Sequence, residues 1–177
     1  MKYIAFIRGI NVGGKNIIKM ADLRKTVAKN GFNNVSIYIQ SGNVIFESAT
    51  TEAGEIAKRL EAAILKDFSY DSKIVVKSQE ELKHIIDKVP SDWQTRDDLR
   101  CYIAFLDRTI TMEEVTKEIE LREGIDSIKT GEGVVYMSTL LSGLTRSRFT
   151  KLVSKIIYKH ITIRNYNTAR KILELMG

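Results

Sequence analysis

Tyr102-Ile103-Ala104-Phe105 repeats, letter for letter, the stretch Tyr3-Ile4-Ala5-Phe6 near the beginning of the chain. Each copy belongs to an apolar run that is typical of a buried strand. After each copy the sequence predicts, in the same order, a helix, two strands and a second helix. Identical letters at the same place in the same order of elements indicate an internal duplication. We therefore expect the two halves to share one fold.

The first half predicts the element order β-α-β-β-α-β, with alternating apolar positions in its strands and a helical apolar stripe in its helices. The strands are expected near residues 2–8, 35–40, 43–47 and 73–77, and the helices near 20–30 and 51–68. This is the ferredoxin-like order, an antiparallel sheet with strand order 4-1-3-2.

The second half predicts a similar series that ends in a C-terminal helix. Strands are expected near residues 102–105, 125–129, 134–138 and 161–164, and helices near 111–121, 147–158 and from 167 onward. The predicted fold class is α+β, two tandem ferredoxin-like (α/β-plait) units with antiparallel sheets. Ser78 and Glu81 form a capping box at the start of a connecting helix, and a polar segment follows it. The predicted division is a first unit over 1–78, a helix and linker over 79–99, and a second unit over 100–177.

The composition limits the function. The 177 residues carry a net charge of +6, which favours anionic partners such as phosphates, nucleotides or nucleic acid. No apolar run is long enough to span a bilayer, and the first one stops at Arg8, so we expect a cytoplasmic protein without a membrane partner. One cysteine and two histidines give no metal-ligand spacing, and Cys101 is expected to be a buried, inert thiol.

The strand order brings three polar segments of the first half to one end of the sheet. They are Arg8 with the loop Gly9–Asn16, the turn Gln40–Asn43, and the start of the fourth strand at Lys73. In this antiparallel sheet, the first and second strands along the chain end at the same edge at which the third and fourth strands begin. We therefore expect these segments to meet although they are distant in sequence.

The loop Gly9-Ile10-Asn11-Val12-Gly13-Gly14-Lys15-Asn16 nearly fits the phosphate-binding pattern G-x-x-x-x-G-K-[ST]. Asn16 stands where a hydroxyl should bind magnesium, and the helix begins several residues late, so nucleotide hydrolysis is disfavoured. Two interpretations stay open. The glycines either satisfy backbone geometry alone or let amides approach an anion, with Arg8, Gly9, Asn11, Gly13, Gly14 and Lys15 as ligand-binding residues.

Two further polar segments complete the predicted site. Gln40-Ser41-Gly42-Asn43 is either an ordinary hairpin turn or a set of polar contacts at the same sheet edge. Near the C-terminus, Asn167 or Thr168 can cap the last helix. The ligand-binding residues predicted there are Arg164, Asn165, Tyr166 and Thr168, a combination suited to phosphate contact and ring stacking.

These same segments resemble a known family. The stretches Arg8–Asn16, Met20–Arg24, Tyr38–Phe46 and Thr162–Thr168, in this order, are similar to the DUF1697 family, a bacterial family of proteins of unknown function. The resemblance implies two α/β-plait units and no established activity, cofactor or substrate. It places the family's characteristic loops at Arg8–Gly14, Gln40–Asn43 and Arg164–Thr168. The chain departs from the family pattern at Tyr166, where tryptophan is typical, and at Ala169, where valine is common.

The leading hypothesis from the sequence is a binding protein for an anionic or nucleotide-like ligand, including nucleic acid. Arg8, Lys15 and Arg164 would supply charge, the glycines backbone donors, and Gln40, Asn43 and Asn165 polar contacts. The alternatives are a small-molecule enzyme with its site between the two halves and a non-catalytic interaction module. No constellation for nucleophilic or acid–base catalysis is evident, and the sequence leaves the cofactor and the oligomeric state open.

Overall fold

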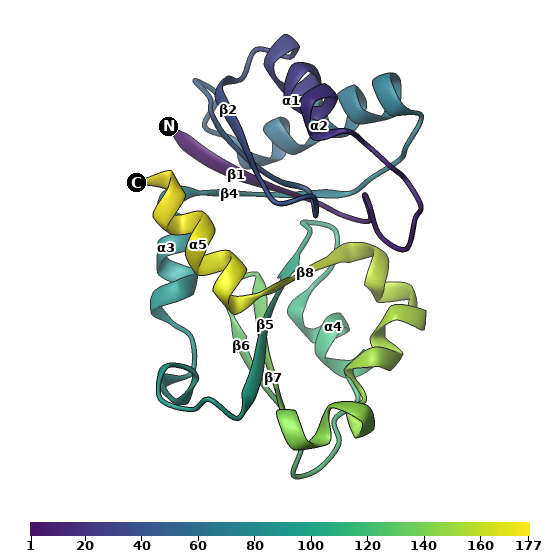
Figure 1. Cartoon of the computed structure of the whole chain (residues 1–177), viewed down its shortest axis with the longest axis vertical. Coiled ribbons are helices and arrows are strands. Elements are labelled where there is room, and N and C mark those ends of the chain that lie inside the picture. Colours follow the sequence, from purple (N-terminus) through teal and green to yellow (C-terminus); the bar gives the residue numbers. More distant parts are fainter. The chain divides into compact units, whose positions relative to one another are not determined.

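The structure is a computed structural model that describes all residues from Met1 to Gly177 (Figure 1). The chain divides into two compact units. The first comprises Met1–Lys83 with Lys171–Gly177, and the second comprises His84–Arg170. The predicted division at residues 78 and 100 therefore differs, because the connecting helix is shared between the units and the end of the last helix returns to the first. Each unit is described by itself.

The first unit contains a four-stranded antiparallel sheet. Its elements are β1 (Lys2–Ile7), α1 (Met20–Lys29), β2 (Asn33–Tyr38), β3 (Asn43–Glu47), α2 (Ala53–Phe68), β4 (Ile74–Ser78) and the beginning of α3 (Gln79–Asp87). The strand order is β2-β3-β1-β4, so the predicted order 4-1-3-2 is confirmed. The predicted capping box is also present, with Ser78 and Glu81 exchanging bonds of 2.7 and 3.1 Å.

Helices α1 and α2 cover one face of this sheet (Figure 1). Alternate residues of β1, namely Tyr3, Ala5 and Ile7, pack beneath them, because successive side chains of a strand point to opposite faces. Ile4 and Phe6 on the other face are buried as well. Within this unit, Lys2 Nζ donates to the carbonyl of Met176 at 2.6 Å, which ties β1 to the end of the chain.

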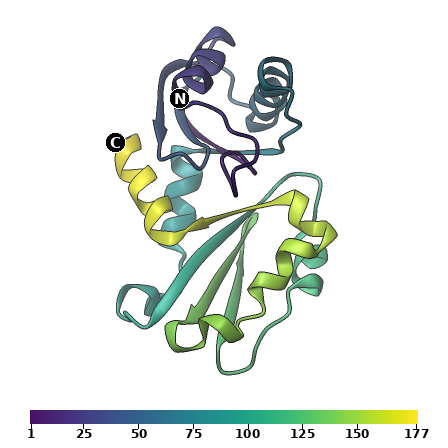
Figure 2. The same ribbon diagram turned by 45° about the vertical axis from the view of Figure 1, so that its right-hand side comes forward.

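The second unit also contains a four-stranded antiparallel sheet, in the order β6-β7-β5-β8. Its elements are the end of α3, a short 3-10 helix η1 (Ser91–Gln94), β5 (Leu99–Leu106), α4 (Met112–Glu118), β6 (Asp126–Gly131), β7 (Val134–Leu140), three 3-10 helices, β8 (Ile161–Asn165) and the start of α5 (Tyr166–Met176). Helix α4 and the 3-10 helices over Phe149–Ser154 and Ile156–His160 pack over one face of the sheet (Figure 2). Strands β6 and β7 form a hairpin that turns at Gly131–Gly133, and Thr111 and Glu114 form a capping box at the start of α4.

The helix predicted over 147–158 is wrong. The chain instead forms three 3-10 helices, η2 (Leu141–Arg146), η3 (Phe149–Ser154) and η4 (Ile156–His160). Extended backbone at Ser147 and Lys155, with ψ near 140° and 147°, separates them. The amide of Arg148, just before η3, donates to Asp126 Oδ2 at 2.9 Å, which fixes this segment to the start of β6.

Two boundaries were also predicted imperfectly. The segment expected to be a polar linker contains η1, where Trp93 is buried against Tyr136 with ring centroids 5.9 Å apart. The last helix begins at Tyr166 rather than Asn167. Its cap is Asn165, whose Oδ1 accepts from the Asn167 amide at 2.9 Å, and not Asn167 or Thr168. None of the helices combines the length and the hydropathy that crossing a bilayer requires.

Candidate functional site

The loop between β1 and α1 is a small β-hairpin. The amide of Asn11 donates to the carbonyl of Asn16 at 3.1 Å, and the amide of Lys15 donates to the carbonyl of Val12 at 3.0 Å. Gly13 and Gly14 form its tip with φ of 57° and 75°. A two-residue hairpin turn of this type requires positive φ at both central positions, which glycine adopts without strain. Both glycines lie open to solvent, and no hydrogen bond occupies their amides.

Asn11 fastens this hairpin to the neighbouring turn. Its Nδ2 donates to the carbonyl of Gln40 at 3.0 Å and to that of Ile18 at 3.1 Å, while its Oδ1 accepts from the Ile18 amide at 2.8 Å. Asn16 holds the base, because its Nδ2 donates to the carbonyl of Gly9 at 3.1 Å. The side-chain amide of Asn11, which was predicted to contact a ligand, thus fixes the loop.

The turn Gln40–Asn43 lies directly against the end of β1. The amide of Ile7 donates to the carbonyl of Gly42 at 2.8 Å, and a Cβ at Gly42 would come within 2.7 Å of the Ile7 carbonyl. Asn43 is buried, and its Nδ2 donates to the carbonyl of Tyr38 and to Ser41 Oγ. Asn43 therefore builds the turn, while Gln40 is exposed at its tip.

Arg8 connects the hairpin to the start of β4. Its amide donates to the carbonyl of Lys73 at 3.3 Å, and its own carbonyl accepts from Ser72 Oγ at 2.8 Å and from Tyr70 Oη at 3.1 Å. Its Nε is buried. Gly9, with φ of 72°, leaves no room for a Cβ beside the hydroxyl of Tyr70. The predicted meeting of the loop, the Gln40 turn and the start of β4 at one end of the sheet is therefore confirmed.

Exposed basic residues continue from this hairpin along α1. We call the set the loop–α1 basic surface, and its members are Lys15, Lys19, Arg24, Lys25 and Lys29. None of the five forms an ion pair. Between Met1 and Phe46 the chain holds seven basic residues and one acidic residue, Asp22. A positive charge that is not neutralised by neighbours persists here.

The other predicted ligand residues belong to the second unit. Arg164 Nη1 donates to Thr162 Oγ1 at 2.9 Å and to the carbonyl of Ile163 at 3.0 Å. Burial lowers the pKa of the Arg164 guanidinium to about 10, so the group still carries charge at neutral pH. Asn165 caps α5, and Thr168 is half-buried in its first turn.

Tyr166 is only 5% exposed. Its ring meets that of Trp93 edge-on with centroids 5.3 Å apart, and the Arg170 guanidinium lies 5.7 Å from the ring centre. This packing leaves little of the ring for a stacked ligand, so it counts against the stacking role, which remains a prediction. A role of Arg164, Asn165 and Thr168 in a site shared with the first unit likewise remains a prediction.

A polar cluster that sequence reasoning missed lies where β5 ends. Asp107 Oδ2 lies 3.0 Å from His160 Nδ1, and Thr109 Oγ1 lies 2.6 Å from Asp107 Oδ1 and 2.9 Å from the same imidazole nitrogen. The cluster could have been predicted from the strand order. Residues 107 and 160 lie next to Leu106 and Ile161, which pair at the ends of β5 and β8. A hydroxyl nucleophile would need the opposite ring nitrogen, so the cluster is not a catalytic triad.

Other groups offer little chemistry. Burial raises the pKa of Cys101 to about 11, which keeps the thiol protonated and unreactive at neutral pH. No group of three or more His, Cys, Asp or Glu side chains is placed to hold a metal ion anywhere in the chain.

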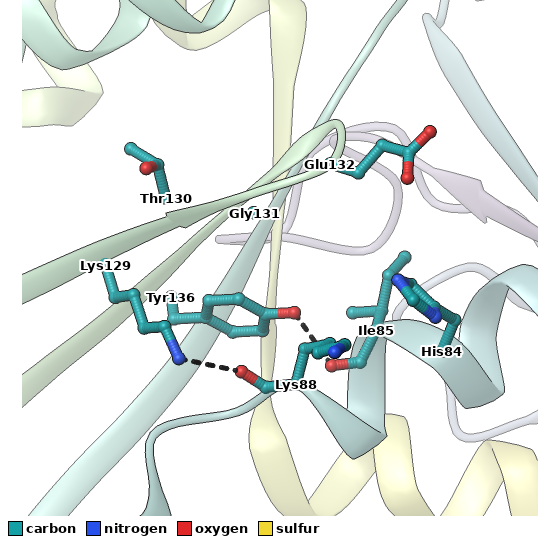
Figure 3. A pocket seen from close by; sticks show the side chains of 8 residues that line it. All are labelled: His84, Ile85, Lys88, Lys129, Thr130, Gly131, Glu132 and Tyr136. Atoms are coloured by element: carbon teal, nitrogen blue, oxygen red, sulfur yellow. Dashed lines mark hydrogen bonds between the residues drawn. The ribbon is translucent and has the colours of Figure 1, made fainter.

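A hollow of about 210 Å³ lies between the end of α3 and the β6–β7 hairpin (Figure 3). Its polar groups point to main-chain carbonyls: Tyr136 Oη donates to Ile85 at 2.8 Å and Lys129 Nζ to Lys88 at 3.3 Å. Burial raises the pKa of Tyr136 to about 12, so the hydroxyl stays a donor. These groups join α3 to the hairpin, and we assign the hollow no ligand.

The fold and the site together define an α+β protein with two four-stranded antiparallel sheets and, in its first unit, a basic hairpin fixed at one sheet edge. The chain belongs to the DUF1697 family, described as "Protein of unknown function (DUF1697)", whose model matches residues 1–136. The matched region includes the Gly9–Lys19 hairpin and the Gln40–Asn43 turn but not Arg164–Thr168.

Among solved structures, the chain is similar to the conserved bacterial protein SP0830 from Streptococcus pneumoniae. The two are 27% identical with a TM-score of 0.87, over 99% of this chain and 98% of that one. A comparison with curated proteins finds no match.

Proposed function

We propose that this protein binds a phosphate-bearing anionic ligand, with nucleic acid as the leading class, through the Gly9–Lys19 hairpin and the loop–α1 basic surface. The observation that carries this proposal is the hairpin itself. It is fixed to the Gln40 turn by Asn11, and it presents two unoccupied glycine amides next to Lys15. Exposed amides beside a lysine suit phosphate oxygens, which accept hydrogen bonds and carry negative charge.

The length of the basic surface favours a chain of phosphates over a single one. The ten residues of α1, at 1.5 Å rise per residue, extend about 15 Å beyond the hairpin. Arg24, Lys25 and Lys29 are exposed on that helix. A mononucleotide could reach the hairpin alone, whereas a nucleic acid strand could contact both segments.

The alternative explanation of the loop–α1 basic surface is an ordinary solvated surface. The second unit shows how basic residues are arranged on such a surface. There Lys117 pairs with Glu113, Arg148 and Lys151 pair with Glu120, and Lys155 pairs with Glu118, at distances from 2.8 to 3.5 Å. The loop–α1 basic surface lacks such partners. Its unpaired charge supports a role in binding an external anion.

We further propose that the two units are duplicated ferredoxin-like units. The two sheets share the same strand order, and β1 and β5, which carry the repeated tetrapeptide, occupy equivalent places in it. In this proposal the connection after the first strand is longer in the first unit than in the second, and the longer connection binds the ligand.

The test is fluorescence anisotropy of a labelled single-stranded RNA of mixed sequence at low salt. We expect saturable binding by the wild type and weaker binding by Lys15→Gln/Lys19→Gln. The matched control is Lys117→Gln/Lys171→Gln, which removes the same charge from two lysines already paired with Glu113 and Glu174. If both double variants weaken binding equally, the loss depends only on net charge and the proposed site is refuted. If the wild type binds no RNA at low salt, the nucleic-acid version is refuted.

A further inference from the structure

A second hollow, of about 520 Å³, lies in the second unit between the segment that follows α4 and the start of η3. Its lining is Leu121, Arg122, Glu123, Gly124 and Arg148. None of these residues belongs to the hairpin site or to the loop–α1 basic surface. The hollow is therefore independent of the function proposed above.

One buried carboxylate anchors the backbone at both arginines. Asp126 Oδ2 accepts from the amide of Arg122 at 3.0 Å and from the amide of Arg148 at 2.9 Å, while Oδ1 accepts from Thr139 Oγ1 at 2.8 Å. Burial alone would raise the pKa of Asp126, but hydrogen bonds from Arg148, Ser147, Arg122 and Thr139 outweigh it and lower the pKa. An ionised carboxylate thus fixes the two backbone segments from which the arginines project.

The two arginines differ in what they contact. Arg148 Nη1 lies 3.5 Å from Glu120 Oε2, and the same carboxylate also pairs with Lys151 and Lys155. Arg122 forms no ion pair, although it lines the same hollow. A guanidinium group presents a fork of donors that matches phosphate or carboxylate oxygens, so the two arginines that line this hollow with Glu123 have the chemistry to receive such a group.

We propose that this hollow binds the oxyanion group of a small ligand, a phosphate or a carboxylate, between Arg122 and Arg148. Asp126 acts as the positioning residue, and Glu120 acts as an internal competitor for Arg148. The competitor leads to two opposite effects on affinity. Removing the Glu120 carboxylate strengthens binding of the ligand, and removing one arginine weakens it.

The test uses two probes, inorganic phosphate and acetate, titrated into the full chain at constant ionic strength. Binding is followed by ¹H–¹⁵N NMR at the Gly124 amide and at the Nε–H groups of Arg122 and Arg148. We expect saturable shifts at these signals with at least one probe, and the probe that saturates names the oxyanion class. In Arg122→Gln the affinity is expected to fall about tenfold, the loss of one charge-assisted contact.

Two matched controls separate a site from general charge. Arg146→Gln removes an exposed arginine outside the lining and is expected to leave the affinity unchanged. Glu120→Gln is expected to tighten binding about threefold or more, while Glu113→Gln, which breaks the exposed pair with Lys117, does not. The proposal is overturned if neither probe saturates, if Arg146→Gln weakens binding as much as Arg122→Gln, or if both glutamate variants act alike.

Discussion

The connection between the first strand and the first helix differs between the two units. In the first unit, twelve residues from Arg8 to Lys19 connect β1 to α1. In the second unit, five residues from Asp107 to Thr111 connect β5 to α4. The short connection is closed on itself, because Asp107 and Thr109 bond to each other and to His160. The strand order alone does not require the longer connection, although Ile10 and Ile18 of this connection are buried in the core of the first unit.

The connections also differ in charge. The long connection contains Arg8, Lys15 and Lys19 and no acidic residue, whereas the short one contains both Asp107 and Arg108. The first therefore offers the positive charge of Lys15 and Lys19 to solvent, and the second has opposite formal charges that sum to zero. Under the proposed function, the long connection is available for binding a ligand, whereas the short one builds structure.

The largest effect is expected at the contact between the Gln40 turn and β1. Gly42→Ala places a Cβ against the carbonyl of Ile7 in a left-handed backbone conformation, with φ of 77°. We expect it to lower the free energy of unfolding by about 3 kcal/mol in urea denaturation. Gly13→Ala, which has similar φ but open space around it, should cost only about 1 kcal/mol. Equal losses would show that the close approach is unimportant.

A smaller loss is expected when the hairpin is released from the turn. Asn11→Ala removes the bonds to Gln40 and to Ile18, and about 2 kcal/mol of stability should be lost. Asn16→Ala removes one exposed bond to Gly9 and should cost about half as much. Hydrogen exchange at the Ile18 amide should accelerate in the first variant alone. Unchanged exchange there would mean that Asn11 does not fix the loop.

Acid should weaken the second unit through Asp126. Because the folded pKa of Asp126 is lowered, its contribution is complete above the unfolded pKa of 3.8 and is lost as pH falls through the folded value. Trp93, the single tryptophan, is buried in this unit and reports its unfolding by fluorescence. We expect Asp126→Asn to be less stable at neutral pH and to lose less stability on acidification than the wild type. Parallel acid profiles for the two proteins would contradict this assignment.

The smallest effect is a gain in stability. Ile39, in the turn beside Gln40, has φ of 52°, a conformation that a β-branched residue rarely adopts, and its side chain is 49% exposed. Ile39→Asn should raise the free energy of unfolding by about 1 kcal/mol, because asparagine tolerates this conformation. Val12→Asn, an exposed apolar residue of the hairpin without positive φ, should change stability by less than about 0.5 kcal/mol. A loss of stability in Ile39→Asn would show that the isoleucine has a packing role.

Much of the fold could be predicted from local patterns. Alternating apolar residues located the strands, and the repeated tetrapeptide predicted that the first strands of the two halves occupy equivalent places. The strand order then placed Arg8, the Gln40 turn and Lys73 at one sheet edge, and the bonds from Ile7 to Gly42 and from Arg8 to Lys73 confirm this. These features follow from short-range periodicity and general topology.

The three 3-10 helices could not be predicted in this way. Their apolar residues, such as Leu152 and Ile157, are spaced as in a helix. The breaks lie at Ser147 and Lys155, where the backbone is extended, and next to the first of them Arg148 donates its amide to Asp126, twenty-two positions earlier in the chain. A local pattern carries no information about a hydrogen bond between distant residues.

The structure confirms that the predicted loop and the Gln40–Asn43 turn meet, whereas ligand binding by their side chains remains a prediction. Asn11 and Asn43 looked like ligand contacts because they are polar residues in loops, yet both hold backbone carbonyls in the folded protein. Tyr166 looked like a stacking platform, yet it packs against Trp93. Residue type indicates which chemistry a side chain can perform, but only packing decides whether solvent can reach it.

The salt dependence of RNA binding tests most directly whether the long connection is a phosphate site. Each phosphate contact to a single strand contributes about 0.7 to the slope of log affinity against log salt concentration. We predict that Lys15→Gln/Lys19→Gln lowers the magnitude of this slope by about 1.4 relative to the wild type, while Lys117→Gln/Lys171→Gln leaves it unchanged. Equal slopes for the wild type and Lys15→Gln/Lys19→Gln would contradict the account, because the two lysines would then touch no phosphate.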